Sequence, residues 1–302
     1  MHVPLFPGIS TPAASKAPAV QELLSRIERS ARLAVLTGAG CSTASGIPDY
    51  RDANGEWKRT PPMRFQDFTA SHAARQRYWA RSLIGWQQFS SVEPNAAHFA
   101  LAALEEAGRL CGLITQNVDG LHQRAGSRSV IDLHGRIDLV ACLQCQTRIS
   151  RIDFQRQLGR LNPGWSALRA TPAPDGDALL ENADFAAFQI PHCEQCSGIL
   201  KPDVVFFGEA VPQQRVSDAF QCIADSDLLL VAGSSLMVYS GYRFVRAARE
   251  RGIAVLIVNL GRTRADAEAD LKISADCAEV LPWIAAAVAD GKRDENIDRI
   301  TR

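Results

Sequence analysis

The sequence predicts an α/β fold: a Rossmann-like, doubly wound parallel sheet with a smaller inserted zinc-binding module and a helical insertion. Five apolar runs of β-type residues indicate the sheet, at 33–37, 112–115, 130–133, 227–233 and 254–259. These runs are nearly continuous rather than alternating, which is typical of parallel strands covered on both faces. Helical patterns at 96–108 and 241–252 precede the second and fifth runs, as the alternation of such a fold requires.

Composition excludes several classes of partner. The chain has 302 residues, of which 46% are hydrophobic, so it can bury one large core or two unequal ones. Thirty-three basic residues balance thirty-three acidic ones, so no net positive field favours nucleic acid or a membrane surface. No apolar run approaches the roughly 18 residues of a membrane helix, and the first residues lack a signal-peptide core. We therefore expect a cytoplasmic protein.

The order of the patterns divides the chain into seven parts. A loose Pro-rich leader is expected at 1–20 and a C-terminal tail at 291–302. The sheet domain is expected in three segments, 21–60, 95–137 and 199–290. Two stretches interrupt it, a helical insertion at 61–94 that is rich in Arg and aromatic residues, and a module at 138–198 bounded by cysteine pairs.

The first strand is followed by Gly38, Ala39 and Gly40, a turn that brings backbone N–H groups close to a pyrophosphate. Ser42 adds a hydroxyl donor. The usual dinucleotide fingerprint has a third glycine where this sequence has Thr43. We therefore expect the chain to leave this turn as a loop and not as a closely packed helix.

That loop carries Asp49 and Arg51 over the expected pocket. A carboxylate can accept hydrogen bonds from a carboxamide such as that of nicotinamide, and a guanidinium can neutralise phosphate. The alternative is a solvated surface ion pair.

Polar residues also follow the other strands, at the edge of the sheet where ligands of parallel sheets bind. Gln116, Asn117 and Asp119 come directly after the second strand, and so dense a polar cluster indicates a polar ligand. His134 follows the third strand and is the candidate general base, because imidazole titrates near neutral pH. A histidine with a purely structural role is the alternative.

Four of the eight cysteines form two Cys-x-x-Cys pairs, Cys142 with Cys145 and Cys193 with Cys196. Two such pairs that converge form a tetrahedral zinc site, and four thiolates leave no open position for catalysis. We predict one structural zinc, with four buried free thiols as the alternative.

The sequence resembles the sirtuin family of NAD-dependent protein deacylases in a series of segments between residues 24 and 281. Besides the cysteine pairs they are GAGCSTASGIPDYR, TQNVDGLH, DLHG, KPDVVFFGE, GSSLMVYS and VNLG, in the family's order and at matching spacing. The segment RQRYWARSLIGW and the long insertion containing LNPGWSALRATPAPDGD are similar to those of class II sirtuins. This class includes mitochondrial lipoamidase or ADP-ribosyltransferase-like members and their bacterial relatives.

The resemblance implies a role for each matching residue. It implies that NAD, the cosubstrate, contacts Gly38, Ala39, Gly40, Ser42, Asp49, Tyr50, Arg51, Gln116, Asn117, Val118, Asp119, Gly233, Ser234, Ser235, Asn259, Leu260, Gly261 and Cys277. It implies that an acyl-lysine peptide is clamped by Val205, Phe206, Gly208, Glu209, Leu236 and Met237. His134 matches the catalytic base, and Asn117 and Asp119 match residues that position the ribose and the attacking water.

The implied reaction transfers an acyl group from lysine to ADP-ribose and releases nicotinamide, without hydride transfer. Alternatives on the same scaffold are a long-chain or lipoyl-lysine deacylase and a protein ADP-ribosyltransferase. A non-catalytic NAD sensor is disfavoured by His134, and a nucleic-acid-binding zinc protein is disfavoured by the zero net charge.

The helical insertion bears on acyl preference. At helical spacing Trp79, Leu83 and Trp86 fall on one face, which either lines an acyl channel or forms the insertion's own core. Tyr78 and Arg81 have the Tyr-x-x-Arg spacing of desuccinylating sirtuins. Since long-acyl class II members carry the same two residues, they do not predict a succinyl preference.

Overall fold

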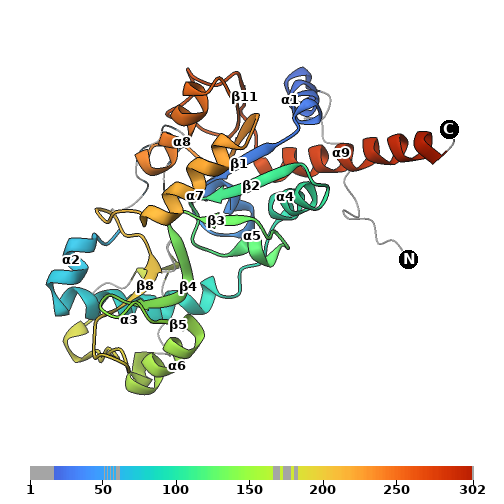
Figure 1. Ribbon diagram of the computed structural model, residues 1–302. Coiled ribbons are helices and arrows are strands. Elements are labelled where there is room, and N and C mark those ends of the chain that lie inside the picture. Colours follow the sequence, from blue (N-terminus) through green and yellow to red (C-terminus); the bar gives the residue numbers. More distant parts are fainter. Residues whose placement is uncertain are drawn as a thin grey trace.

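The computed structural model describes residues 17–50, 52, 54, 56, 58, 62–165, 171–172, 178–179 and 183–300, with side chains up to residue 290 and not at 171–179. Six parallel strands form the main sheet (Figure 1). They are β1 (Leu33–Thr37), β2 (Leu110–Thr115), β3 (Val130–Asp132), β9 (Leu228–Ala232), β10 (Ala254–Val258) and β11 (Leu271–Ile273). The predicted doubly wound parallel sheet is confirmed.

The strand order is β11-β10-β9-β1-β2-β3, so the chain builds outward from β1 in one direction and then returns to build in the other. This is the Rossmann order, and its switch point lies between β1 and β9. The short, half-exposed β11 was not predicted, because three residues carry too little periodicity to be recognised.

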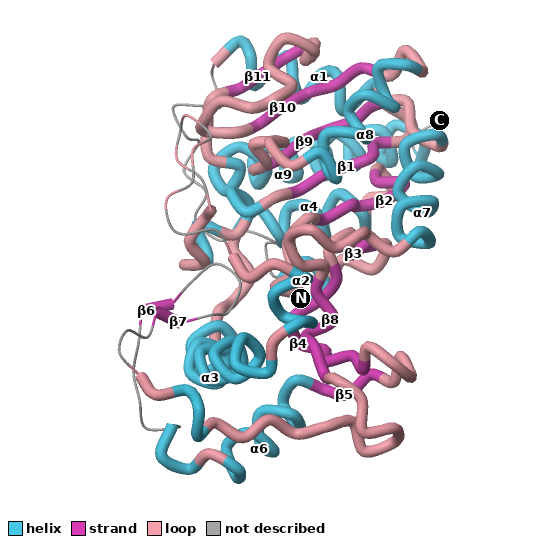
Figure 2. The backbone as a smooth tube through the Cα atoms, turned by 90° about the vertical axis from the view of Figure 1, so that its left-hand side faces the viewer, coloured by secondary structure: helices cyan, strands magenta, loops and turns pink. Residues whose placement is uncertain are grey.

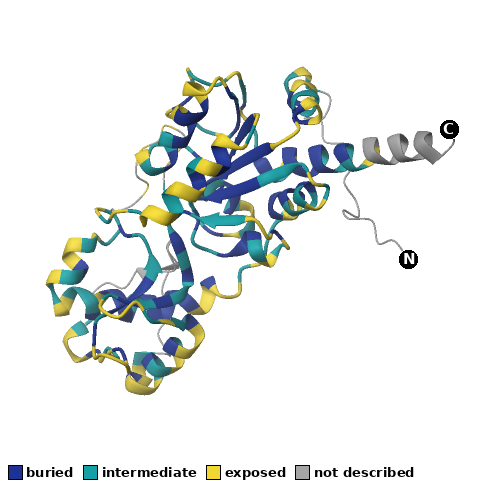
Figure 3. Ribbon diagram, in the orientation of Figure 1, coloured by how far each residue is buried: buried dark blue, intermediate teal, exposed yellow. Residues whose placement is uncertain are grey.

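Helices cover both faces of this sheet. On one face lie α1 (Pro18–Arg29), α4 (Ala96–Glu106) and α9 (Cys277–Ile300), and on the other lie α7 (Gln213–Ala224) and α8 (Tyr239–Glu250). Residues of β1 alternate between the two cores: Leu33 and Val35 face the first, and Ala34 and Leu36 face the second. All five residues of β1 are buried, which explains why its sequence is continuously apolar (Figure 3).

A smaller unit lies beyond β3 (Figure 2). Its helices are α2 (Phe65–Ala70), α3 (His72–Phe89) and α6 (Arg151–Leu161), and its three-stranded antiparallel sheet has the order β5-β4-β8. These strands are β5 (Arg148–Ser150), β4 (Gly135–Cys142) and β8 (Leu200–Val204). The remaining short elements are α5 (Leu121–Arg124), β6 (Thr171–Pro172) and β7 (Ala178–Leu179).

The two insertions that the sequence suggests separately share one hydrophobic core. Phe68 and Trp79 of the helical insertion pack with Phe154, Phe188 and other residues of the cysteine module. The buried side chain of Arg151 joins the same two parts. Its guanidinium lies 5.0 Å from the Trp86 ring centroid and 5.6 Å from that of Trp79, and donates to the Ser82 carbonyl at 3.1 Å.

The first and last helices can be compared with the expected boundaries of the leader and the tail. Residues 1–16 lie outside the described part, and α1 begins at Pro18, inside the expected leader. Helix α9 continues through most of the expected tail, to Ile300. None of the described helices is long and apolar enough to cross a membrane.

Candidate functional site

A cavity of about 530 Å³ lies where β1, β2, β9 and β10 end. Its wall includes the turn after β1, the polar run after β2, the turn after β9 and the loop after β10. The cavity therefore occupies the switch point, where open parallel sheets bind their ligands, and its size is typical of a small-molecule site.

Two glycine turns pack against each other at the base of the cavity. The Gly40 N–H donates to the Gly233 carbonyl at 2.8 Å. Gly233 has a φ of +63°, and a Cβ there would lie 2.2 Å from the backbone nitrogen of Cys41. A Cβ on Gly38 would lie 2.7 Å from that of Ser234. Side chains are thus excluded from a cradle of backbone groups, which fits a pyrophosphate.

After Gly38 the chain makes two short 3-10 turns, Ala39–Cys41 and Thr43–Ser45, and continues as a loop. This is the loop that the missing third glycine predicts. In place of that glycine, the Thr43 hydroxyl donates to the Gly40 carbonyl at 3.0 Å. Asp49, farther along, pairs with Lys58 at 2.5 Å, and both residues line the cavity. Arg51 lies outside the described residues.

Asn117, Ser42 and Asp119 form one hydrogen-bonded group. The Asn117 amide donates to the Gly38 carbonyl and to the Ser42 hydroxyl, each at 3.0 Å. Ser42 donates its proton to Asp119 at 2.7 Å, so in this structure the hydroxyl supports Asp119. Burial raises the pKa of Asp119, while the bonds from the Leu121 N–H and Ser42 oppose that rise. The group fixes the polar run after β2 against the turn after β1.

His134 lies two residues after the end of β3, between Gln116 and Ser240. Its Nδ1 lies 3.0 Å from the Gln116 carbonyl and its Nε2 lies 2.8 Å from the Ser240 hydroxyl. A carbonyl only accepts, so Nδ1 carries the proton and Nε2 has the free electron pair. Burial lowers the pKa of His134 to about 4. The imidazole is therefore neutral near pH 7, with its basic nitrogen available.

Two further buried histidines lie behind this site. His98 Nδ1 accepts from the Asn95 backbone N–H, so His98 Nε2 is the protonated nitrogen that faces Ser42 at 3.4 Å. His122 Nε2 lies 2.9 Å from the Thr37 hydroxyl. Burial lowers the pKa of His98 to about 4, and that of His122 falls well below its usual value for the same reason.

These histidines predict that the fold loses stability in mild acid. Between about pH 6.5 and pH 4 the unfolded chain binds protons that His98 and His134 do not bind in the folded state. The free energy of unfolding therefore falls as pH falls through this range, by about 2 kcal/mol per histidine at pH 5. Urea unfolding at pH 7.5 and pH 5 measures the loss. His134→Gln should lessen the difference in unfolding free energy between the two pH values by about 2 kcal/mol. An unchanged difference would show that His134 does not have a lowered pKa in the folded state.

The segment after β8 forms another wall of the cavity. The Val205 N–H donates to the His134 carbonyl at 2.8 Å. Glu209 accepts from the Phe206 N–H at 2.8 Å and pairs at 3.1 Å with Lys201, whose side chain is buried. Leu236 and Met237, after β9, also line the cavity. The six residues expected to clamp a peptide therefore lie around one opening.

The structure places every predicted NAD and peptide residue on the wall of this cavity, apart from Arg51. From the NAD set these are Gly38, Ala39, Gly40, Ser42, Asp49, Tyr50, Gln116, Asn117, Val118, Asp119, Gly233, Ser234, Ser235, Asn259, Leu260, Gly261 and Cys277. Several other lining residues were not predicted as site residues, and two of them are used below. Ser240 lies in the segment GSSLMVYS, but a serine at the start of a helix is too common to stand out. Phe89 follows the aromatic face of the helical insertion by three residues and was not assigned to it.

The acyl-channel interpretation of Trp79, Leu83 and Trp86 is wrong. Trp79 and Leu83 are fully buried in the core of the smaller unit, and the Trp79 indole donates to the Leu200 carbonyl at 3.2 Å. None of the three lines the cavity, and neither do Tyr78 and Arg81. The sequence left both interpretations open because it does not reveal that the cysteine module covers this face.

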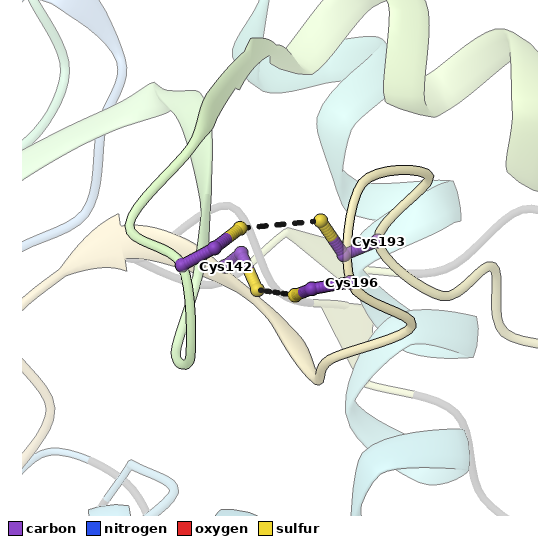
Figure 4. Close-up of side chains that lie close together, drawn as sticks. Cys142, Cys193 and Cys196 are labelled. Carbon is purple, nitrogen blue, oxygen red and sulfur yellow. Dashed lines mark hydrogen bonds between the residues drawn. The ribbon is translucent and has the colours of Figure 1, made fainter.

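The four paired cysteines converge at the far end of β4 and β8 (Figure 4). The Sγ atoms of Cys142 and Cys196 lie 3.5 Å apart, those of Cys145 and Cys193 lie 3.6 Å apart, and all four lie within 4.8 Å of one another. Four sulfurs at 2.3 Å from a tetrahedral zinc are about 3.8 Å apart. The donor set and spacing therefore fit one structural zinc.

Comparisons with known proteins agree with these features. A profile described as "Sir2 family" matches residues 38–240. The chain is 58% identical over 271 residues to NAD-dependent protein deacetylase 2 of Bradyrhizobium diazoefficiens, covering 89% of this chain and 99% of that protein. It is 50% identical over 268 residues to human mitochondrial NAD-dependent protein lipoamidase sirtuin-4, covering 88% and 85%. A solved Sir2 complex with p53 peptide and NAD+ has a TM-score of 0.68 at 31% identity, covering 90% and 98%.

Proposed function

The chain belongs to the Sir2 family and is an NAD-dependent protein deacylase, and we propose that His134 is the general base of its acyl transfer. The observation that carries this proposal is the orientation of the imidazole. Nδ1 is bound to the Gln116 carbonyl, which leaves Nε2 as the basic atom beside the cavity. A base that is neutral near pH 7 can take a proton from a substrate hydroxyl without first losing one of its own.

NAD is proposed to lie across the ends of β1, β9 and β10. The backbone cradle of Gly38, Gly40 and Gly233 receives the pyrophosphate, and the residues after β10 receive the adenosine part. When bound, NAD supplies the ribose that accepts the acyl group and the nicotinamide that leaves. Asn117 and Asp119 hold the nicotinamide side of the site in a fixed geometry through Ser42.

Ser240 is proposed to be a positioning residue. Its hydroxyl is a donor to His134 Nε2 and holds the ring in the plane set by Gln116. The donor must turn away when Nε2 accepts a proton, and a hydroxyl can do so by rotating about one bond.

An acyl-lysine peptide is the proposed protein substrate. The segment 205–209 and the residues Leu236 and Met237 line the same cavity, and we propose that an extended peptide adds between them. The ion pair of buried Lys201 with partly exposed Glu209 stiffens the segment after β8.

Incubation of the zinc-loaded chain with NAD and an acetyl-lysine peptide tests the proposal. We expect nicotinamide, deacetylated peptide and acetyl-ADP-ribose in equal amounts, identified by mass spectrometry. ADP-ribose attached to a protein would indicate a transferase instead. Binding of NAD without nicotinamide release would indicate a sensor.

Removal of longer acyl groups is a second candidate activity, because part of the cavity wall is apolar and aromatic. This part includes Ile47, Phe89, Val118, Val204, Phe206 and Phe207. Each CH₂ that is buried against such a wall contributes about 0.8 kcal/mol, or roughly a fourfold gain in kcat/KM.

Phe89→Ala is expected to lower kcat/KM about tenfold for an octanoyl-lysine peptide and less than about threefold for acetyl-lysine, since only the longer chain loses apolar contact. Both peptides are measured at saturating NAD. Phe99→Ala is the matched control, because Phe99 is 44% exposed and does not line the cavity. Equal losses for the two peptides would show that Phe89 does not contact the acyl chain.

We further propose the cytoplasm as the compartment, with neither nucleic acid nor membrane as a partner. A thiolate tetrad keeps its metal where thiols stay reduced, and the formal net charge of zero gives no general attraction to polyanions. Cell fractionation and a DNA-binding assay at low salt test these points.

A further inference from the structure

Cys111 and Cys222 lie together at the amino end of β2, outside the cavity. The pairing of β1 with β2 skips one residue there: Leu33 pairs with Leu110, and Ala34 pairs with Gly112. Cys111 is therefore the extra residue of a β-bulge, and a bulge redirects its side chain. The Cys111 Sγ lies 3.8 Å from the carbonyl oxygen of Cys222 on α7.

Gly112, the residue after Cys111, makes room for the sulfur of Cys222. A Cβ on Gly112 would lie 2.7 Å from the Sγ of Cys222, so only glycine lets this sulfur pack against the strand. The Cys222 sulfur therefore lies against the residue next to Cys111, whose own sulfur lies 3.4 Å from the Leu33 carbonyl oxygen and 3.8 Å from that of Cys222. The bulge and the glycine together bring into contact two cysteines that are far apart in the sequence.

The two thiols differ in their surroundings. Cys111 is partly exposed, whereas Cys222 is buried against the core on the α7 side of the sheet. The neighbouring Cys222 thiol and the charge of Arg32 lower the pKa of Cys111, while burial and Asp225 oppose that shift. The neighbouring Cys111 thiol and burial raise the pKa of Cys222. An accessible thiol of lowered pKa beside a second thiol is the arrangement of redox-sensing cysteines.

We propose that Cys111 and Cys222 form a peroxide-sensitive dithiol that closes to an intramolecular disulfide. The Cys111 thiolate attacks a hydroperoxide oxygen, the O–O bond breaks, and Cys111 becomes a sulfenic acid while the peroxide leaves as water or an alcohol. The Cys222 sulfur then attacks the Cys111 sulfur, the S–O bond breaks, and water leaves with the Cys222 proton. Two thiols lose two electrons in total, and the peroxide gains them.

The test uses the zinc-loaded full chain with one equivalent of hydrogen peroxide, followed by alkylation, proteolysis and mass spectrometry. We expect a peptide pair linked through Cys111 and Cys222, its loss on reduction, and a raised Tm of the oxidised chain. Before oxidation, iodoacetamide should modify Cys111 roughly tenfold faster than Cys222. In Cys222→Ala, dimedone should trap the sulfenic acid at Cys111, and in Cys111→Ser no adduct should form at residue 222.

Cys41 and Cys277 provide a matched internal control. Both residues are buried in one core cluster, and the Cys277 thiol donates to the carbonyl of Gly40, next to Cys41, so this pair should stay reduced at the same peroxide dose. A Cys41–Cys277 disulfide in place of Cys111–Cys222 would overturn the proposal. Release of zinc before any Cys111–Cys222 link appears, or an unreactive Cys111 in Cys222→Ala, would also overturn it. The wild-type arm needs no variant and decides the question even where a variant fails to fold.

Discussion

Cys193→Ser is expected to lose the zinc ion and to unfold the smaller unit, including the helices of the 61–94 insertion. The four sulfurs join the turn after β4 to the loop before β8, and the core beneath them includes Cys142 and Cys193 themselves. Structural zinc contributes about 10–16 kcal/mol of apparent binding free energy in small zinc domains. Even a several-fold smaller loss of free energy is a large fraction of the free energy of unfolding of a typical domain.

The unfolding should also reach the cavity. Strand β4 begins directly after His134, and β8 ends directly before Val205, so both strands lead from the zinc site to the cavity wall. We expect zinc content below one-tenth of wild type, measured by atomic emission, together with poor solubility and no peptide turnover. Cys111→Ser is the matched control, because this cysteine lies outside the smaller unit, and it should keep one zinc per chain. Full zinc occupancy in Cys193→Ser would show that Cys193 is not a ligand.

The main sheet could be predicted because burial on both faces leaves a direct record in the sequence. The strands β1, β9 and β10 are apolar at almost every position, and only a central parallel strand needs that composition. Strand β4 was missed because it alternates between buried and half-exposed residues, and β5 was missed because it has only three residues, none of them buried. Such patterns are also common in loops.

The candidate site could be predicted because parallel strands bring their carboxyl ends to one edge, so residues far apart in sequence meet there. Gly38, Asn117, His134 and Gly233 were found in this way, and all four line the cavity. What the sequence could not supply is the partner of each side chain. That Ser42 donates to Asp119, or that Trp79 packs under the cysteine module, depends on contacts between distant segments.

His134→Ala is expected to lower kcat for acyl transfer by about 10² to 10⁴, the range for loss of a general base. The Gln116 carbonyl fixes the proton on Nδ1, and in the described part of the cavity wall no other imidazole can take over at Nε2. NAD affinity, measured by calorimetry, should change by less than about threefold, because the backbone cradle that is proposed to hold the pyrophosphate is untouched.

The pH profile and a control variant separate a chemical role of His134 from a structural one. The anionic phosphates of bound NAD favour the protonated imidazole, so the acid limb of kcat should lie at higher pH than that of kcat/KM, which reports the free enzyme and its pKa of about 4. Ser240→Ala keeps the base and removes only a hydrogen bond to Nε2, so its kcat should fall by no more than about tenfold. Loss of a histidine with only a structural role would lower stability and NAD affinity more than it lowers kcat. A folded His134→Ala enzyme with near-wild-type kcat would therefore show that His134 takes no part in the reaction.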